Sequence, residues 1–547
     1  MKAMVMAPRS TTPNQAPLME FKHINDIEKA GQKGGVQLIR LGLGVAFVVG
    51  VMIYAMLRGG NGGSLYIVAA AVVGGYMALN IGANDVANNV GPAVGSKALT
   101  LGGALFIAAI FEAAGAIIAG GEVVGTIRSG IINPDLIPNK ETFIWVMLAA
   151  LLAAALWLNA ATAIGAPVST THSIVGAVIG SGVAAAGMGI VAWGKMGQIA
   201  ASWVVSPVLG GLVAAGLLFV IKRSITYQID KVAAARQVVP WLMALMGWSF
   251  TTYLLLKGLS KLWKVSTPMA MLLGMGVAVA VWLLVRRVLR HHAQSMDNNK
   301  EAVNDLFTWP LIFAAALLSF AHGSNDVANA VGPLAAIVDM ASSTADGISK
   351  NAPVPLWVMG IGALGISVGL ALYGPRVIRT VGSEITELDK TRAYCIAMAA
   401  TLTVIVASEM GLPVSSTHIA VGAVFGVGFL REYLKNRYDR LVEEIKSHHP
   451  EADQAALNAF LAEFREASVA EKGQMLDDLK GRVKRQQDPA NFSKPERKTL
   501  KKVYRRELVK RSQLLRIAAA WVITVPASAL ISALVFYMLR SALVTPV

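Results

Sequence analysis

Apolar segments long enough to cross or enter a membrane recur along almost the whole of this chain, and they restrict its fold more than any other feature. Thirteen such segments occur, at residues 38–57, 65–81, 100–119, 143–164, 172–193, 201–221, 238–256, 268–285, 309–321, 354–373, 393–408, 414–430 and 515–539. Only helices and closed barrels satisfy their backbone groups inside lipid, and segments of this length match helices. With 55% hydrophobic and 15% charged residues, the sequence predicts an all-α polytopic membrane protein of about 12 transmembrane segments.

Two polar motifs within this apolar sequence each occur twice. GANDVANNVGP at 82–92 and GSNDVANAVGP at 323–333 share nine of eleven residues, and PVSTTHSIVGAVIG at 167–180 and PVSSTHIAVGAVFG at 413–426 share ten of fourteen. The order of the motifs is the same in both copies, and 85 and 90 residues separate their starting points. The chain is therefore expected to contain two related halves.

Positive charge marks the expected cytoplasmic side. Of the 49 Lys and Arg residues, 20 lie within 431–511, and further clusters lie in 22–40, 222–237 and 286–300. By the positive-inside rule these segments are cytoplasmic, so the net charge of +16 reflects membrane topology and not nucleic-acid binding. The expected location is the inner (plasma) membrane, with the N-terminus and 431–511 in the cytoplasm and the C-terminus outside. Counting the crossings gives the two halves opposite orientations, which predicts an inverted-repeat secondary transporter with broken or re-entrant helices.

Six parts follow from this topology. They are a cytoplasmic N-terminal segment (1–36), a first membrane repeat (37–221), a linker with two transmembrane helices (222–304), the first part of a second repeat (305–430), a charged cytoplasmic insertion (431–511) and a final helix that completes the second repeat (512–547). The insertion could be a regulatory or lipid-binding module, but a solvated linker is the preferred interpretation. The single Cys395 excludes an intrachain disulfide, and residues 1–36 lack the apolar core of a signal peptide.

The NDVAN motifs place ionisable groups in a membrane setting. Asp85 with Asn88, and Asp326 with Asn329, are three residues apart and would share one helix face. An intramembrane Asp costs about 2.5–3.5 kcal/mol on insertion scales, so the duplicated pair predicts a binding site rather than hydrogen bonds that merely join helices. Gly and Gly-Pro pairs flank both motifs (Gly82, Gly91–Pro92, Gly323, Gly332–Pro333) and are expected to break these helices.

The PVS motifs place hydroxyl groups at the start of a helix, where free N–H groups and the helix dipole attract anions. The candidate substrate-binding hydroxyls are those of Ser169, Thr170, Thr171, Ser415, Ser416 and Thr417. Ordinary N-capping would explain one hydroxyl in each copy but not three. His172 and His418 are expected to brace their loops by hydrogen bonds rather than to bind a metal.

Neither motif contains a Lys or Arg residue, so an anion beside two aspartates requires a coupling cation. Sodium ions or protons would serve. A protonated phosphate can donate a hydrogen bond to a carboxylate, whereas sulfate cannot, and this difference favours phosphate.

Both motifs, their order and their duplication resemble those of the inorganic phosphate transporter (PiT) family. The resemblance is carried by GANDVANNVGPAVGS, HGSNDVANAVGP and the two PVS(T/S)TH loops. It implies cation-coupled phosphate uptake on an inverted-repeat helical fold, with Asn84, Asp85, Asn325 and Asp326 in cation and phosphate binding and the six hydroxyls around phosphate. Sodium is a candidate ion at Asp85 and Asp326. Glu112 resembles a family acidic position and would be a third coupling group or would pair with a neighbouring helix.

Other functions stay open at this point. A sulfate permease of the same fold is the closest alternative, followed by a passive anion channel or exporter. A membrane-bound enzyme has little support, because no nucleotide loop, nucleophile triad or metal-hydrolase cluster occurs in the sequence. The expected partners are inorganic phosphate, the coupling cation and membrane lipid, with no cofactor and no nucleic acid. The oligomeric state is not determined, and a homodimer is one alternative.

Overall fold

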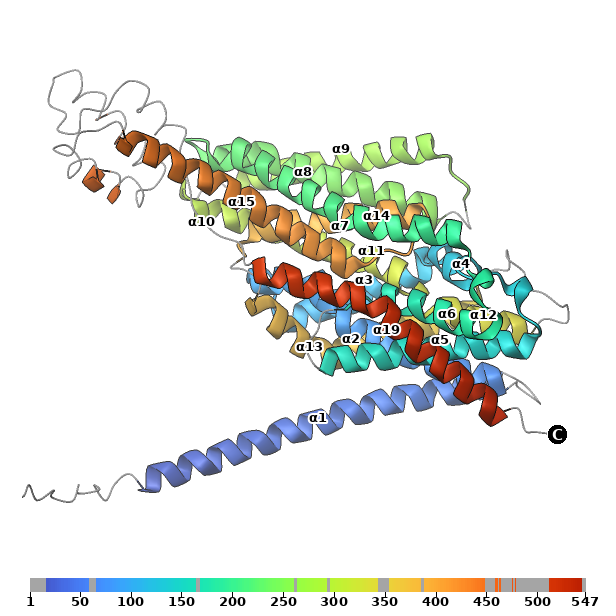
Figure 1. Cartoon of the computed structure of the whole chain (residues 1–547). Helices are drawn as coiled ribbons and strands as arrows, with labels where there is room; N and C mark the ends of the chain where they lie inside the picture. The colour runs from blue at the N-terminus through green and yellow to red at the C-terminus, as the bar shows by residue number, and fades with distance from the viewer. Residues whose placement is uncertain are drawn as a thin grey trace, which may run out of the picture.

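The computed structural model describes residues 16–58, 65–163, 168–259, 263–292, 296–342, 354–384, 388–447 and 511–543, with a few positions between 458 and 478. These residues are almost entirely helical (Figure 1). The helices are α1 (Ala16–Arg58), α2 (Leu65–Gly95), α3 (Leu101–Ala119), α4 (Gly121–Ser129), α5 (Lys140–Ala163), α6 (Thr170–Ala186), α7 (Trp193–Ile221), α8 (Lys231–Tyr253), α9 (Thr267–His292), α10 (Lys300–Leu306), α11 (Thr308–Asp326), α12 (Ala328–Ser342), α13 (Leu356–Glu384), α14 (Lys390–Glu409), α15 (Ser416–Ser447) and α19 (Arg511–Leu543). Two short 3₁₀ helices, η1 (Pro134–Leu136) and η2 (Met188–Ile190), and two short π-helices, η3 (Lys222–Thr226) and η4 (Leu254–Gly258), complete the list.

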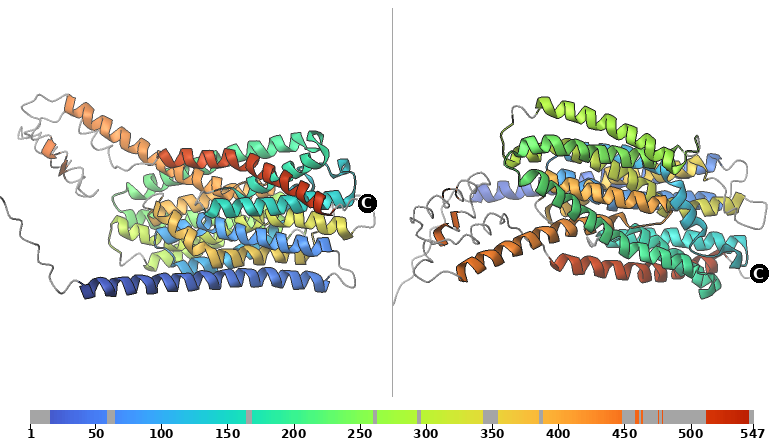
Figure 2. Two further views of the ribbon diagram at one scale, coloured as in Figure 1. Left: turned by 60° about the horizontal axis from the view of Figure 1, so that its bottom comes forward. Right: turned by 90° about the horizontal axis from the view of Figure 1, so that it is seen from above.

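Membrane-length helices dominate this architecture. Eleven helical stretches in the described part of the chain are long and apolar enough to span a bilayer, and α6 is a shorter apolar helix. The helices run roughly parallel in one bundle, with α1 along one side and the α8–α9 pair on another (Figure 2). The predicted all-α polytopic membrane fold is confirmed. Within the described ranges, the only β pairing is an isolated bridge between Ile132 and Val191.

The two halves interlock through equivalent helix pairs. Helix α2 of the first half packs along α13 of the second, and α11 of the second half packs along α3 of the first. In the same way, α6 packs against α19 and α15 packs against α7. Each pair joins the two halves, and each has its counterpart with the halves exchanged. The duplication in the sequence therefore appears in the structure as reciprocal packing of one half on the other.

Small residues make these contacts close. A Cβ atom added to Gly180 would lie 2.0 Å from the carbonyl oxygen of Ala529, and one added to Gly426 would lie 2.0 Å from that of Gly211. Gly180 and Gly426 are equivalent positions of the two PVS motifs. Close backbone approach at small residues is the usual way in which membrane helices associate. The glycines of the PVS motifs therefore allow α6 to pack closely on α19 and α15 to pack closely on α7.

The prediction of helix breaks at the glycines of the NDVAN motifs is wrong in detail. Helix α2 runs unbroken through Gly82 with Pro92 inside it, and in the second half the break lies after Asp326, at Val327. An added Cβ at Gly82 would lie 2.0 Å from the carbonyl oxygen of Ile366, and one at Gly323 would lie 2.1 Å from that of Glu112. These glycines therefore allow close contact between helices rather than a break in the helix.

The PVS motifs join helices in two hairpins, α5–α6 and α14–α15. Helix α6 runs toward the end of the bundle where α19 finishes, and α15 runs toward the end where α1 begins (Figure 1). In the charged 431–511 segment, α15 continues as a helix to Ser447. Most of the remainder of that segment lies outside the described residues.

Candidate functional site

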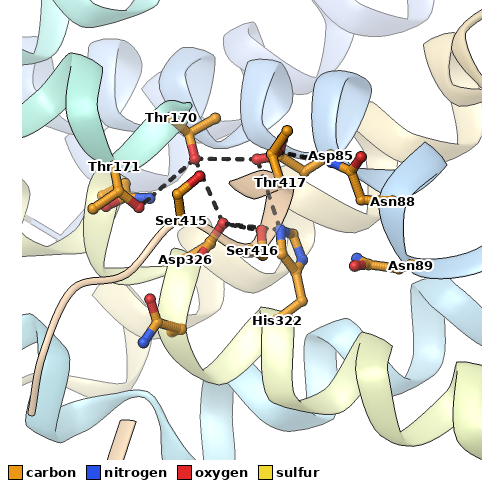
Figure 3. Close-up of polar contacts among 12 residues, drawn as sticks. Asp85, Asn88, Asn89, Thr170, Thr171, His322, Asp326, Ser415, Ser416 and Thr417 are labelled. Atoms are coloured by element: carbon orange, nitrogen blue, oxygen red, sulfur yellow. Dashed lines mark hydrogen bonds and ion pairs between the residues drawn. The ribbon is translucent and has the colours of Figure 1, made fainter. Parts of the chain in front are cut away.

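Two buried aspartates from opposite halves meet at the starts of α6 and α15 (Figure 3). The hydroxyl of Thr170 lies between them, with its Oγ1 3.1 Å from Oδ2 of Asp85 and 3.5 Å from Oδ2 of Asp326. A hydroxyl has one hydrogen to donate, so it cannot satisfy both carboxylates in full. The structure thus brings the two acidic groups of the duplicated motif to one centre.

Hydroxyl groups of the second hairpin complete the contacts of both carboxylates. Ser416 donates to Oδ2 of Asp326 at 3.0 Å, and Thr417 donates to Oδ1 of Asp85 at 3.0 Å. Asn88 in turn donates its amide hydrogen to Oγ1 of Thr417 at 2.8 Å. Asp85 is therefore held by hydroxyls from both hairpins, which makes its surroundings depend on the relative position of the two halves.

The second half repeats the amide contact. Asn329 lies 3.2 Å from the hydroxyl oxygens of both Thr170 and Thr171. Thr171 itself donates to the backbone carbonyl of Val414 at 2.9 Å, which ties the first hairpin directly to the second. Asp85 and Asn88 lie on one helix, as expected, whereas Asp326 ends α11 and Asn329 lies in α12. Both residues of the second motif still reach the hydroxyl of Thr170.

Ser169 and Ser415 lie beside this cluster and act as helix caps. The backbone N–H groups of His172 and His418 donate to the Oγ atoms of Ser169 and Ser415, each at 3.2 Å. Ser169 Oγ also lies 2.8 Å from Nδ1 of His172, as expected for a histidine that braces its loop. The two histidine rings lie 4.4 Å apart between centroids, and His172 stacks on Trp203 at 3.7 Å.

The first asparagine of each motif joins its helix to a hairpin tip. Asn84 donates to Oδ1 of Asp85 at 2.9 Å and to the carbonyl of Val168 at 3.1 Å. Asn325 donates to the hydroxyl of Ser408 at 2.9 Å and to the carbonyl of Leu412 at 3.2 Å. The side-chain N–H groups of both asparagines thus donate to other groups of the protein. Their side-chain carbonyl oxygens are the atoms that could bind a cation.

His322 is a buried polar residue of this cluster that the sequence analysis missed. Its Nε2 lies 3.0 Å from Oδ2 of Asp326 and 3.7 Å from Oδ2 of Asp85, and its Nδ1 lies 3.3 Å from Oε2 of Glu112. Glu112 also accepts a hydrogen bond from Asn89 at 2.8 Å, so it both joins a neighbouring helix and reaches the cluster. The signal was available, since a polar His322 precedes the second motif in an otherwise apolar helix.

Several buried oxygen atoms here can serve a cation. Oδ1 of Asp326 and the side-chain carbonyl oxygens of Asn89, Asn325 and Asn329 accept no hydrogen bond among the described residues. Ligand atoms of Asp85, His322 and Asp326 all lie within 4.8 Å of one another. Carboxylate and carbonyl oxygens are the donors that hard cations prefer. The donor set therefore fits sodium through its oxygens.

Two basic side chains, Arg128 and Lys257, form ion pairs with other acidic groups. Arg128 of α4 forms an ion pair with Asp339 of α12. Lys257 lies 3.4 Å from Oε1 of Glu122 and 3.7 Å from Oε1 of Glu409 at the end of α14. The basic group beside both aspartates is His322, which carries a charge only when protonated.

Comparison with known proteins identifies the family to which the chain is related. Residues 81–532 match the model of the phosphate transporter family. A protein of Helicobacter pylori strain J99 named "Putative phosphate permease" is 51% identical over 528 residues, which cover 95% of this chain and 99% of that protein. One of Thermococcus kodakarensis with the same descriptive name is 41% identical over 67% of this chain and 89% of its own. A solved structure described as "The sodium-dependent phosphate transporter" matches with a TM-score of 0.70 and 30% identity, over 88% of this chain and all of the other.

Proposed function

Because this chain belongs to the phosphate transporter family, we propose that it is a secondary active symporter that takes up inorganic phosphate together with a cation. The observation that carries this proposal is the pair of buried aspartates, one from each inverted half, which share the hydroxyl of Thr170. Alternating access requires a site at the interface of two repeats that can move against each other. The contacts of Asp85 with both hairpins meet that requirement.

Phosphate is the substrate that this chemistry favours. The hydroxyls of Thr170, Ser416 and Thr417 contact the two carboxylates. The amide of Asn88 donates to Thr417, and that of Asn329 donates to Thr170 and Thr171. Hydroxyls can donate to phosphate oxygens, while a protonated phosphate can donate to a carboxylate. The starts of α6 and α15 add their free N–H groups and positive dipole ends. Sulfate would accept the same donors but would face the carboxylates without a proton to offer.

Sodium is the coupling ion that the oxygen atoms support. The buried carbonyl oxygens of Asn325 and Asn329 and Oδ1 of Asp326 offer hard ligands without a hydrogen-bond donor among the described residues. The sodium dependence in the name of the matched structure supports the same choice. In this role, Asp85 and Asp326 hold the cation and the cation holds the anion. Without a bound cation the two carboxylates would repel phosphate, so the cation and phosphate bind together.

The proposed orientation places the N-terminus and the 431–511 segment in the cytoplasm. Helix α1 begins, and α15 ends, at one end of the bundle, whereas α19 finishes at the other (Figure 1). The clusters of Lys and Arg lie in the segments at the first end. On this orientation the α5–α6 hairpin enters from outside and the α14–α15 hairpin from the cytoplasm.

Uptake of labelled phosphate into proteoliposomes tests the proposal. An inward sodium gradient should drive accumulation, and removal of sodium at constant ionic strength should abolish it. Arsenate, which has the shape and protonation of phosphate, should compete well and sulfate poorly. Uptake that follows a proton gradient alone would identify protons, and not sodium, as the coupling ion. Equal inhibition by sulfate and arsenate would favour a sulfate permease. Equilibration without any gradient dependence would contradict symport.

A further inference from the structure

Residues 411–414, named the connector below, link α14 to α15 in a non-helical conformation. A carbonyl group at membrane depth costs several kcal/mol if no group donates to it, because lipid tails offer no hydrogen-bond donor in place of water. Each of the four connector carbonyls accepts a hydrogen bond from a side chain of another helix. The donors, in the order of the connector residues, are Thr126 (2.7 Å), Asn325 (3.2 Å), Trp203 (3.0 Å) and Thr171 (2.9 Å).

The connector belongs to the second half of the chain, but three of its four donors belong to the first half. These three lie on α4, α7 and α6, and the fourth lies on α11. The first hairpin is held differently, because the carbonyl of Val168, which is equivalent to Val414, accepts from Asn84 of its own half. The second hairpin is therefore held at its tip across the interface between the two halves.

Trp203 joins the two hairpins. Its indole Nε1 donates to the carbonyl of Pro413 in the connector at 3.0 Å. Its ring stacks on that of His172, with 3.7 Å between the centroids. His172 in turn lies 2.8 Å from the hydroxyl of Ser169, which caps α6. A single side chain of α7 thus contacts both the connector and the start of α6.

Thr126 holds the other end of the connector. Its hydroxyl donates to the carbonyl of Gly411 at 2.7 Å. Gly411 has a φ angle of 63° and follows the last residues of α14, which is the usual place for a glycine in the left-handed conformation. The chain therefore leaves α14 at this glycine with its carbonyl directed at α4.

The hydroxyls that reach the aspartates follow the connector directly in the sequence. Ser416 donates to Asp326 and Thr417 donates to Asp85, each at 3.0 Å (Figure 3). Binding groups work well only when supporting contacts hold them within about 0.5 Å of the productive geometry. The side chains of α4 and α7 can therefore act on the proposed phosphate site through the backbone of the connector.

We propose that Thr126 and Trp203 are positioning residues of the phosphate site, which act by holding the connector carbonyls. This inference rests on the proposed function, because phosphate binding is the property that the two residues support. Both residues belong to the first half, whereas the connector and the hydroxyls after it belong to the second. Movement of one half against the other therefore changes the position of these hydroxyls, and the first half sets the affinity of ligand groups that lie on the second.

Conservative variants separate positioning from packing. Thr126→Val keeps the shape of the side chain and removes its hydroxyl, and Trp203→Phe keeps an aromatic ring beside His172 and removes the N–H group. Each variant should weaken equilibrium binding of labelled phosphate to the purified full-length protein in saturating sodium by roughly two- to tenfold, since one neutral hydrogen bond is lost. Thr126→Ser keeps the hydroxyl and should retain the affinity. Trp203→Phe carries the test if Thr126→Val does not fold.

A matched control removes a bond of the same kind elsewhere between the halves. Ser367 of α13 donates to the carbonyl of Ala109 of α3 at 2.9 Å, away from the connector. Ser367→Ala should therefore leave the phosphate affinity unchanged. A loss as large as that of Thr126→Val and Trp203→Phe would assign the effect to a looser interface in general and would overturn the proposal.

Hydrogen–deuterium exchange without phosphate tests the contacts independently of the substrate. Thr126→Val and Trp203→Phe should each speed amide exchange in residues 411–418 several-fold and leave the exchange of α9 unchanged. Unchanged exchange in 411–418 would overturn the proposal, as would unchanged phosphate affinity in both variants when the wild-type protein binds phosphate. A wild-type protein that binds no phosphate would instead overturn the proposed function, and the exchange rates would still show whether the two residues hold the connector.

Discussion

The two NDVAN motifs have the same backbone packing but different chemistry behind the aspartates. Gly82 lies against the carbonyl of Ile366 just as Gly323 lies against the carbonyl of Glu112. The residue before each glycine is Ile81 in the first half and His322 in the second. The buried apolar residues Ile81 and Ile366 thus stand where His322 and Glu112 form a buried polar pair, and each of these pairs joins the two halves. The helix contact is preserved in both copies of the motif, whereas the polar pair accompanies only the second copy.

This difference gives the aspartates unequal surroundings. His322 lies 3.0 Å from Asp326 but 3.7 Å from Asp85. Both aspartates receive hydroxyl contacts from both hairpins. Asp85 lies 3.1 Å from Thr170 and 3.0 Å from Thr417, and Asp326 lies 3.5 Å from Thr170 and 3.0 Å from Ser416. The two surroundings therefore differ in the imidazole, which lies on the helix of Asp326 and closer to it, and in the hydroxyl of Thr170, which lies closer to Asp85.

The largest effect is expected from the aspartates themselves. Asp85→Asn and Asp326→Asn should each lower cation-driven phosphate uptake by at least about a hundredfold, because each carboxylate makes several charge-assisted contacts worth about 1.5–3 kcal/mol apiece. Proteoliposome uptake measures the loss, and size-exclusion chromatography checks folding. Near-normal transport in one variant would show that only one half carries the coupling.

Removing the histidine tests the polar half directly. His322→Ile should lower the free energy of unfolding by about 3–5 kcal/mol, since it leaves Glu112 buried beside an apolar group. The double variant His322→Ile/Glu112→Ile reproduces the pair of the first half and should recover much of that stability while transport stays low. Thermal unfolding in detergent provides the measurement. If the single and double variants are equally unstable, the His–Glu contact is not the source of the effect.

The glycines test the part that the halves share. Gly82→Ala and Gly323→Ala should each destabilise the protein by about 3 kcal/mol, the upper end of the usual cost of overpacking a core. The cost is high because the new methyl group would clash with a backbone carbonyl that is fixed within a helix. The two losses should be similar. A loss confined to one position would mean that the two helix contacts are less alike than their geometry indicates. Gly216→Ala, where an added Cβ meets nothing within 4 Å, is the control.

The threonines test the unequal hydroxyl contacts. Thr417→Val removes a hydrogen bond to the carboxylate of Asp85, which costs about 1.5–3 kcal/mol and should weaken apparent phosphate affinity by about tenfold or more. Thr171→Val removes a bond to the neutral carbonyl of Val414 and should cost only about 0.5–1.5 kcal/mol. The concentration dependence of uptake compares them. Equal losses would assign both hydroxyls to the ligand itself.

The smallest effect is expected at the helix caps. Ser169→Ala and Ser415→Ala should each lower the free energy of unfolding by about 1 kcal/mol, the usual cost of an N-cap. Gly in place of either serine should cost only a few tenths of a kcal/mol. Thermal unfolding measures the caps and phosphate titration measures any binding role. A loss of affinity larger than the loss of stability would show that these hydroxyls also hold phosphate.

The apolar segments and the duplicated motifs predicted the fold class correctly, because lipid leaves helices as the main solution for such segments. The same patterns predicted the residues that gather around the two aspartates, apart from His322 and Asn89. They failed on the helix breaks. A glycine in an apolar helix permits both a break and a close contact, and only the neighbouring helix decides between them.

By itself, the sequence determined that this chain spans the membrane, that it has two related halves and that each half carries an Asp, two Asn residues and a set of hydroxyls. These properties follow from local composition and repetition. The tertiary structure decided which half contributes to which contact: Thr417 of the second hairpin reaches Asp85 of the first half, and Glu112 of α3 reaches His322 of α11. It also brought basic side chains from five segments to one pocket. Such contacts depend on how the two halves interlock, and helix packing between distant segments leaves no local signal in the sequence.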